Sequence, residues 1–212
     1  MSSARGLFAL GIVATVAMVA LTDAQERRGS PPANSPSAES VIQSWKPMPR
    51  QVAEKLIAKY GKPDEVASQR LVWHGNGPWK HTELVNEEVP HDFPMPHKDM
   101  LKQTINYRID PDDADELIDY DGSVILERTK GEIAARCDKE EANFLAINLA
   151  NDVATGRRNV DDVRKYYAES IMALMKGKPN DYVQGFRFSV PQGDQGDRDK
   201  PFGPVGTTGG NQ

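Results

Sequence analysis

All four histidines of the chain lie within one short stretch, and histidine is the side chain that most often binds transition metals. They are His74, His81, His91 and His97. Side chains two positions apart on a strand share a face, so a hairpin that turns at 75–78 would make His74 and His81 diagonal neighbours. A metal ion could bridge this pair, with His91, His97 or Glu83 completing its coordination shell. Imidazole ligands in this arrangement suit zinc or copper.

The same hairpin has a second interpretation without a metal ion. Its aromatic and imidazole side chains could form a half-buried hairpin surface, and a loop of different length would separate His74 from His81. The chain has neither a His-x-x-x-His pair nor a His-Glu-x-x-His motif, which are the spacings of helical metal ligands. Metal binding is therefore the alternative function, with zinc or copper as its cofactor. The preferred function, derived below, requires no cofactor.

Bulky apolar residues near the same loops indicate a contact surface. They are Trp73, Trp79, Phe93 and Met95, and prolines surround the last two. Aromatic residues and methionine are enriched at the cores of interfaces, so this stretch is a candidate site for an envelope protein or a small ligand. In the alternative, Phe93 and Met95 belong to the hydrophobic core and seal the end of the sheet.

The other residues capable of chemistry do not form a recognisable catalytic motif. The acidic cluster 110–121 fails the spacing of a calcium-binding EF-hand loop, and carboxylates at Asp110 and just after it favour a helix N-terminus. Cys137 shares a predicted strand face with Ile133 and Ala135, so we expect a buried thiol without a nucleophilic role. The chain also lacks a Gly-x-Ser-x-Gly motif and a phosphate-binding loop. Enzymatic activity is not predicted, although the sequence does not decide the question.

The N-terminus has the layout of an export signal. One positive charge at Arg5 precedes an apolar run over 6–21, and small residues follow at Thr22 and Ala24. We expect residues 1–24 to be a signal peptide cleaved near Ala24, which places the mature chain in the periplasm or outside the cell. The alternative is an uncleaved N-terminal membrane anchor, for which this apolar run is short.

Composition excludes several classes of protein for the mature chain. The full chain has 31 acidic and 26 Lys or Arg residues, and no basic stripe that could bind nucleic acid. Beyond the signal, no apolar run is long enough to span a membrane. The single cysteine rules out an internal disulfide, so the fold must depend on its hydrophobic core.

Apolar periodicity predicts one folded domain between two polar ends. Residues 25–44 indicate a disordered linker rich in Pro and Ser, and 191–212 a disordered tail rich in Gly, Asp and Pro. A single domain is expected over 45–190. Its predicted elements are a helix at 49–60, strands at 71–74, 79–85 and 101–109, a short helix from Pro111, a hairpin of 123–127 with 132–136, a helix capped by Asp138 that runs to about 154, a helix at about 160–174, and a final strand at 182–190.

These elements predict an α+β fold. A three-strand meander and a hairpin would form an antiparallel sheet, and helices would cover one of its faces, including an antiparallel helical pair near the C-terminus. Because no catalytic motif is recognisable, the sequence favours an exported, non-catalytic binding or accessory module that contacts a partner or a small ligand.

Overall fold

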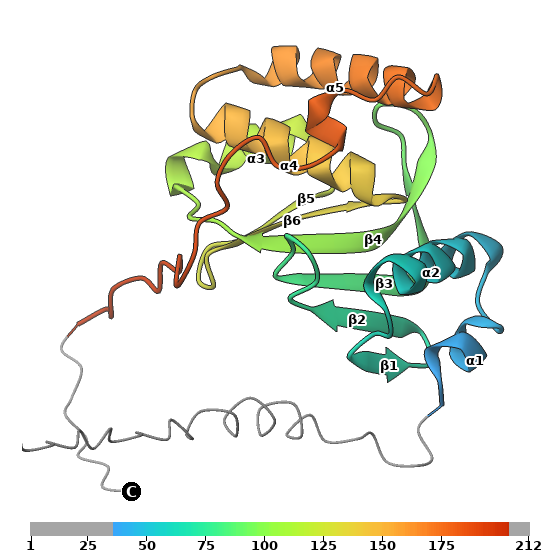
Figure 1. Ribbon diagram of the computed structural model, residues 1–212. Helices are drawn as coiled ribbons and strands as arrows, with labels where there is room; N and C mark the ends of the chain where they lie inside the picture. The colour runs from blue at the N-terminus through green and yellow to red at the C-terminus, as the bar shows by residue number, and fades with distance from the viewer. Residues whose placement is uncertain (1–35, 204–212) are drawn as a thin grey trace, which may run out of the picture. The chain divides into compact units, whose positions relative to one another are not determined.

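The computed structural model describes residues 36–203, and over this range the chain has the predicted α+β fold (Figure 1). A six-stranded antiparallel sheet combines with five α-helices. The predicted signal peptide 1–24 lies outside the described residues, as do the first part of the linker and residues 204–212. Among the residues described, none of the helices has the length and apolar character needed to cross a bilayer.

The sheet contains all the predicted strands of the meander and the hairpin, joined edge to edge. Its strand order is β1-β2-β3-β4-β6-β5, and each neighbouring pair is antiparallel. The meander joins the hairpin where Leu101 pairs with Cys137 and Ile105 pairs with Ile133. The bounds of the strands are β1 Glu65–Ala67, β2 Arg70–His74, β3 His81–His91, β4 His97–Asn106, β5 Val124–Glu127 and β6 Glu132–Cys137.

The helices begin and end close to the predicted signals. Asn159 accepts the backbone N–H of Asp162 and starts the last helix, and Gly61, with a φ of 80°, ends the second one. Asp110 accepts the N–H of Asp112, as the capping interpretation of the acidic cluster predicted. The elements are α1 Ala38–Ile42, α2 Pro47–Tyr60, a 3₁₀ turn Pro111–Asp113, α3 Ala114–Tyr120, α4 Glu140–Ala154, α5 Val160–Met175 and a 3₁₀ turn Asp181–Val183.

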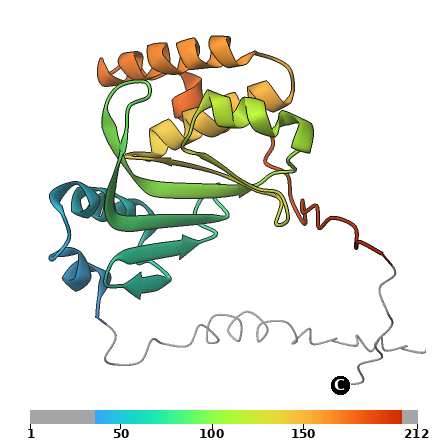
Figure 2. The ribbon, with the colours of Figure 1, turned by 180° about the vertical axis from the view of Figure 1, so that it is seen from behind.

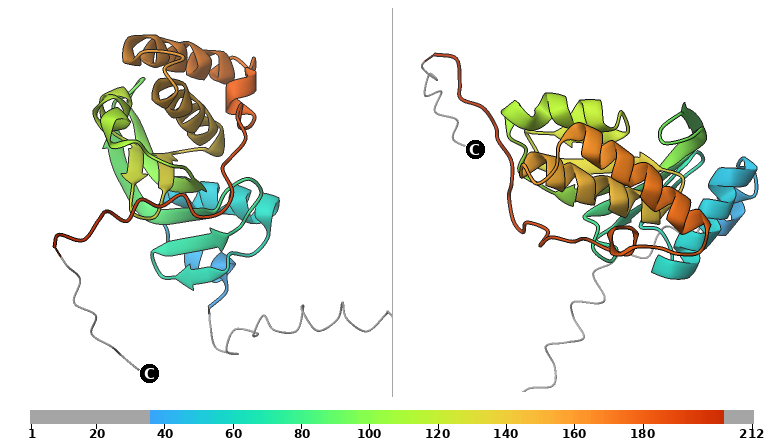
Figure 3. Two further views of the ribbon diagram at one scale, coloured as in Figure 1. Left: turned by 90° about the vertical axis from the view of Figure 1, so that its left-hand side faces the viewer. Right: turned by 90° about the horizontal axis from the view of Figure 1, so that it is seen from above.

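Helix α4 lies between the sheet and α5 (Figures 1 and 3). Almost every side chain of α4 is buried, including the polar Asn143, Asn148 and Asn151, because the sheet lies on one side of the helix and α5 on the other (Figure 1). Together with β4, β6 and α5 it forms a hydrophobic cluster that we call the α4 cluster, which includes Ile105, Ile133, Leu145, Leu149 and Val163.

A second cluster lies under the first two helices, and it corrects the predicted linker. Residues 38–42 form helix α1 instead of a disordered spacer, and Ile42 is only 2 % exposed. Ser37 caps this helix by accepting the N–H of Ser40. The α2 cluster combines Ile42, Trp45, Leu56, Leu71, Trp73, Leu84 and Leu101. The folded part therefore begins before residue 45, because the side chain of Ile42 is buried in the same cluster as that of Trp45.

The predicted final strand at 182–190 is wrong. After the 3₁₀ turn this segment has no strand pairing, and the side chain of Asn148 takes the place of a neighbouring strand. Its amide donates to the carbonyls of Tyr182 and Gly185, and its oxygen accepts the N–H of Arg187. One side chain on α4 thus satisfies backbone groups that a sheet would otherwise have paired.

The predicted disordered tail begins as a segment packed on the molecule (Figure 2). Arg128, in the turn between β5 and β6, forms ion pairs with Asp197 and Asp199. Its carbonyl also accepts the N–H of Asp197 at 3.0 Å. Residues 191–199 therefore lie along the β5–β6 turn, held by polar contacts that the low apolar content of the segment did not reveal.

Candidate metal site at the end of strands β3 and β4

The four histidines form two separate pairs instead of one cluster. His74 pairs directly with His81 at one end of β3, because the connecting loop is longer than predicted. His91 pairs with His97 at the other end, about 30 Å away along the strand. His74 is exposed and contacts Glu65, with 2.7 Å between Nε2 and Oε1. The predicted four-histidine site is therefore not formed.

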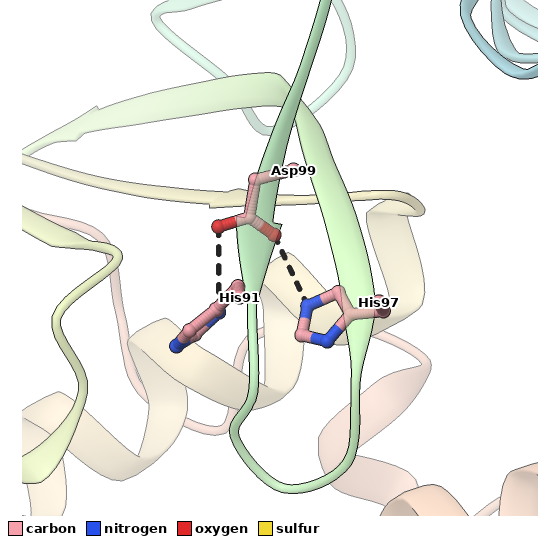
Figure 4. Close-up of side chains that lie close together, drawn as sticks. All are labelled: His91, His97 and Asp99. Atoms are coloured by element: carbon pink, nitrogen blue, oxygen red, sulfur yellow. Dashed lines mark ion pairs between the residues drawn. The ribbon is translucent and has the colours of Figure 1, made fainter.

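The second pair meets a buried carboxylate. His91 and His97 lie opposite each other on β3 and β4, and Asp99 follows two positions later on the same face of β4. Figure 4 shows both imidazole rings beside this carboxylate. Asp99 Oδ2 lies 3.3 Å from His91 Nδ1, and Asp99 Oδ1 lies 3.1 Å from His97 Nε2. One ligand atom from each residue lies within 4.8 Å of the other two.

Each imidazole also contacts an oxygen with its other nitrogen. His97 Nδ1 is 2.9 Å from the carbonyl oxygen of Met95, which fixes the ring with Nε2 toward Asp99. His91 Nε2 lies 3.6 Å from Asp121 Oδ1. Both rings are therefore held in the orientation that directs the remaining nitrogen toward the buried carboxylate.

Burial sets the electrostatics of this cluster. The Asp99 side chain is 0 % exposed, whereas those of His91 and His97 are 18 % and 15 % exposed. Contact with the Asp99 carboxylate, followed by that with Cys137, raises the pKa of His97 to about 11. Burial raises the pKa of Asp121, although the N–H of Ser123 opposes this shift. The contact with the Asp99 carboxylate thus favours a positive charge at His97.

Each oxygen of the Asp99 carboxylate faces a neighbouring polar group. Oδ1 lies 3.1 Å from His97 Nε2, and Oδ2 accepts a hydrogen bond from the Ser123 hydroxyl. A buried carboxylate is costly without a compensating charge, so the site favours a cation, either protonated His97 or a bound metal ion.

Cys137 is buried, as predicted, and borders the cluster. Its Sγ lies 3.5 Å from His97 Nε2 and 3.5 Å from Asp138 Oδ1. Burial raises the pKa of the thiol despite the opposing effect of His97. A neutral thiol of this kind is a poor nucleophile.

Sequence reasoning found the two histidines but missed Asp99, Asp121 and Ser123. The available signal was His97-Lys98-Asp99, in which alternate positions of a strand carry metal-ligand side chains on one face. It was missed because β4 begins at His97 instead of at Leu101. Asp121 and Ser123 come from the turn before β5, and only the packing of this turn against the β3–β4 hairpin brings them to the site.

The two tryptophans do not form the predicted contact surface. Trp73 and Trp79 are each 2 % exposed, in the α2 and α4 clusters respectively. Their indole N–H groups are used internally, Trp73 donating to the Gly61 carbonyl and Trp79 to Glu140. They are core residues, because Trp73 on β2 packs within the α2 cluster and Trp79, in the loop before β3, packs within the α4 cluster.

Phe93 and Met95 lie in the loop between β3 and β4 and are partly buried against the α4 cluster. The Phe93 ring is 5.1 Å from that of Tyr167, and the guanidinium of Arg164 lies 4.0 Å from its centre. These contacts agree with the alternative interpretation, in which the two residues seal the end of the sheet. They also anchor the loop that precedes His97.

Comparison with known proteins adds no functional information, since no protein-family model, no curated protein and no solved structure matches the chain.

Proposed function

We propose that this chain binds one divalent transition-metal ion through His91, His97 and Asp99, and that the preferred ion is zinc. The observation that carries the proposal is the convergence of three ligand atoms within 4.8 Å of one another, one of them from the buried Asp99 carboxylate. Nitrogen and carboxylate oxygen are the ligands that zinc, copper and non-haem iron share.

The spacing of the ligand atoms fits a single ion. Around tetrahedral zinc, bonds of about 2.0–2.3 Å place neighbouring ligand atoms roughly 3.3–3.8 Å apart. Asp99 Oδ2 lies 3.3 Å from His91 Nδ1 and Asp99 Oδ1 lies 3.1 Å from His97 Nε2, so the two nitrogens face different oxygens of the carboxylate. Binding of one ion would require the side chains to shift until one ligand atom from each residue reaches this spacing.

The surroundings of the histidines support the same conclusion. In metal sites, a ligating histidine almost always directs its other nitrogen to a carbonyl or a carboxylate, which sets the orientation of the ring. Here His97 contacts the Met95 carbonyl and His91 faces Asp121. The outer contacts that a metal site requires are thus present for both rings.

A metal-free alternative exists for the same geometry, in which protonated His97 alone compensates the charge of Asp99. Metal titration distinguishes the two. Zinc, copper(II) and iron(II) would be added singly to untagged, metal-free protein, and bound metal and melting temperature measured. We expect one equivalent of metal to bind, with a stabilisation of about 2.7 kcal/mol at a free concentration 100 times Kd.

Point variants locate the site. Asp99→Asn and His97→Gln should weaken binding by at least about 100-fold, since outer-shell changes alone cost 10–100-fold. His74→Gln and His81→Gln serve as matched controls at the other end of β3 and should bind as the unaltered chain does. Absence of stoichiometric metal together with an unchanged melting temperature would contradict the proposal.

We also propose that the metal is bound after export, on the evidence of the N-terminal sequence pattern at 1–24. Sequencing the N-terminus of the protein from a cell-envelope fraction tests this, and a start near Gln25 is expected. Full-length chain beginning at Met1 in the cytosol would contradict export but leave the metal proposal untouched. The proposed metal site replaces the protein-contact surface at Trp73 and Trp79, which are buried.

A further inference from the structure

Arg164 on α5 contacts both segments of the chain that surround the His91 ring. Its Nη1 donates to the carbonyl oxygens of Tyr120 and Asp119, at 2.6 and 3.2 Å. Its guanidinium lies 4.0 Å from the centre of the Phe93 ring. Phe93 follows His91 by two positions in the β3–β4 loop, whereas Tyr120 is the last residue of α3. One side chain therefore joins this loop to the end of α3.

We propose that Arg164 is a positioning residue of the metal site and that it acts through the orientation of the His91 ring. The inference rests on the proposed function, and it adds to the site a residue that binds no metal itself. By holding the loop against the end of α3, Arg164 keeps the imidazole of His91 beside the Asp99 carboxylate, where Figure 4 shows it.

The other groups that face His91 come from the turn that follows α3. His91 Nε2 lies 3.6 Å from Asp121 Oδ1, and its Nδ1 lies 3.4 Å from the Ser123 hydroxyl oxygen. At the β5 end, the Arg136 N–H donates to the Ser123 carbonyl and fixes the turn to the sheet. At the α3 end, the contact is the one that Arg164 makes with the helix carbonyls. Loss of Arg164 would therefore let this end of the turn shift relative to the ring.

His91 depends on such packing more than His97 does. His97 Nδ1 lies 2.9 Å from the carbonyl oxygen of Met95, so a residue of its own loop sets the orientation of that ring. The outer partner of His91 is Asp121, which belongs to a different segment of the chain. A residue that holds the two segments together is thus expected to act on His91 first.

A guanidinium group suits this position for two physical reasons. The last carbonyls of a helix have no N–H partner within the helix and lie at the negative end of its dipole, so they favour a cation that donates to them. The same planar group can lie against the Phe93 ring, whereas a lysine ammonium acts on a ring only as a point charge. Lysine should therefore replace only part of the contact that Arg164 makes.

The position of the ring can be measured without a metal ion. The chain has four histidines, so the imidazole C–H signals of metal-free protein can be assigned one by one by NMR. Arg164→Met should shift or broaden the His91 signals and leave those of His74 and His81, at the other end of β3, unchanged. Phe93→Leu removes only the aromatic partner, should have the same effect, and serves if Arg164→Met does not fold. Unchanged His91 signals would overturn the inference.

Zinc affinity tests the consequence for the site. Arg164→Met should weaken zinc binding about tenfold, the lower end of the range for outer-shell changes, because Arg164 contacts the partners of His91 and not the ion. Arg164→Lys should bind zinc more tightly than Arg164→Met and less tightly than the unaltered chain. Arg157→Met is the matched control, because Arg157 pairs with the buried Asp152 at 2.8 Å and contacts neither segment. It should lower the melting temperature and leave zinc affinity unchanged.

The outcomes separate a positioning role from a purely structural one. If Arg164→Met lowers the melting temperature but binds zinc as the unaltered chain does, Arg164 only stabilises the fold and the inference is wrong. An equal loss of affinity in Arg157→Met would overturn it as well, because the loss would then follow from stability. If the unaltered chain binds no metal, the proposed function fails, whereas the NMR comparison still decides whether Arg164 positions His91.

Discussion

At the scale of single residues, Glu140 has the most extensive set of contacts in the core. Its carboxylate accepts hydrogen bonds from Lys59, Tyr60, Trp79 and Gln103. Lys59 and Tyr60 belong to α2, whereas Glu140 begins α4, so this side chain links the α2 and α4 clusters. Replacing the carboxylate by an amide keeps one acceptor oxygen but puts an NH₂ group in place of the oxygen that accepts from Lys59.

We predict that Glu140→Gln lowers the free energy of unfolding by about 1–2 kcal/mol, because a charged acceptor is lost while the half-exposed Lys59 is partly compensated by solvent. Chemical denaturation measures the change. Glu141→Gln is the matched control, because the neighbouring side chain is exposed, and it should shift stability by less than about 0.5 kcal/mol. Equal effects of the two substitutions would contradict the role assigned to Glu140.

The same residue predicts a dependence on pH. Burial tends to raise the pKa of Glu140, but the hydrogen bonds from Lys59, Tyr60 and Trp79 outweigh it and lower the pKa in the folded protein. Its stabilising contribution is therefore complete above the unfolded-state pKa and is lost as the pH falls through the lower folded-state value. Denaturation between pH 7 and pH 3 should show a smaller loss of stability in Glu140→Gln than in the unaltered chain. Parallel curves for the two proteins would exclude this contribution.

At the scale of elements, the β3–β4 hairpin determines the metal site and the β5–β6 turn holds the C-terminal segment. The hairpin brings His91 opposite His97, and strand alternation adds Asp99 on the same face. In the other turn, Gly131 has a φ of 64°, and a Cβ atom there would clash with the backbone of Gln195. The β3–β4 hairpin therefore positions the proposed metal ligands, and the β5–β6 turn holds the C-terminal segment.

We predict that Gly131→Ala releases the segment 191–199 from the β5–β6 turn. The left-handed conformation alone costs a residue with a side chain about 1–2 kcal/mol, and the clash with Gln195 adds to it. Limited proteolysis should cut this segment faster in the variant. Gly122→Ala is the control, because no atom lies within 4 Å of a Cβ atom there, and its cleavage rate should stay unchanged.

At the scale of the described domain, two hydrophobic clusters share one sheet. One row of cross-strand neighbours runs across four strands: Leu71 pairs with Leu84, Leu84 with Leu101, and Leu101 with Cys137. These side chains therefore lie on the same face of the sheet. Helices α1 and α2 contribute to the α2 cluster, and α3, α4 and α5 contribute to the α4 cluster. Loss of α1 should therefore uncover part of the α2 cluster.

We predict that a chain truncated to begin at Trp45 is less stable than one that begins at Pro36. Burial of Ile42 alone contributes about 1.5–3 kcal/mol. Ile42→Ala should reproduce most of the loss, about 2–4 kcal/mol by denaturation, without removing any backbone. If both chains unfold at the same denaturant concentration, α1 does not contribute to stability.

Much of the fold follows from local patterns in the sequence. Gly61 and Asn159 mark helix ends through backbone and capping chemistry that depends on only a few neighbouring residues. Alternation identified the strands of the meander, and burial of Cys137 followed from the face that it shares with Ile133. By contrast, the segment 182–190 contains aromatic residues typical of a strand, but Asn148 satisfies its backbone from α4.

The sequence by itself determined the α+β class, the order of most elements and the presence of histidines as candidate ligands, because these depend on residue type and short-range periodicity. Only the tertiary structure decided which histidines meet. The length of the loop after His74 sets the register that pairs His74 with His81 at one end of β3. The early start of β4 at His97 sets the register that pairs His91 with His97 at the other end. Contact between Asp99 and residues of the turn before β5 depends on packing between distant segments, which no local pattern encodes.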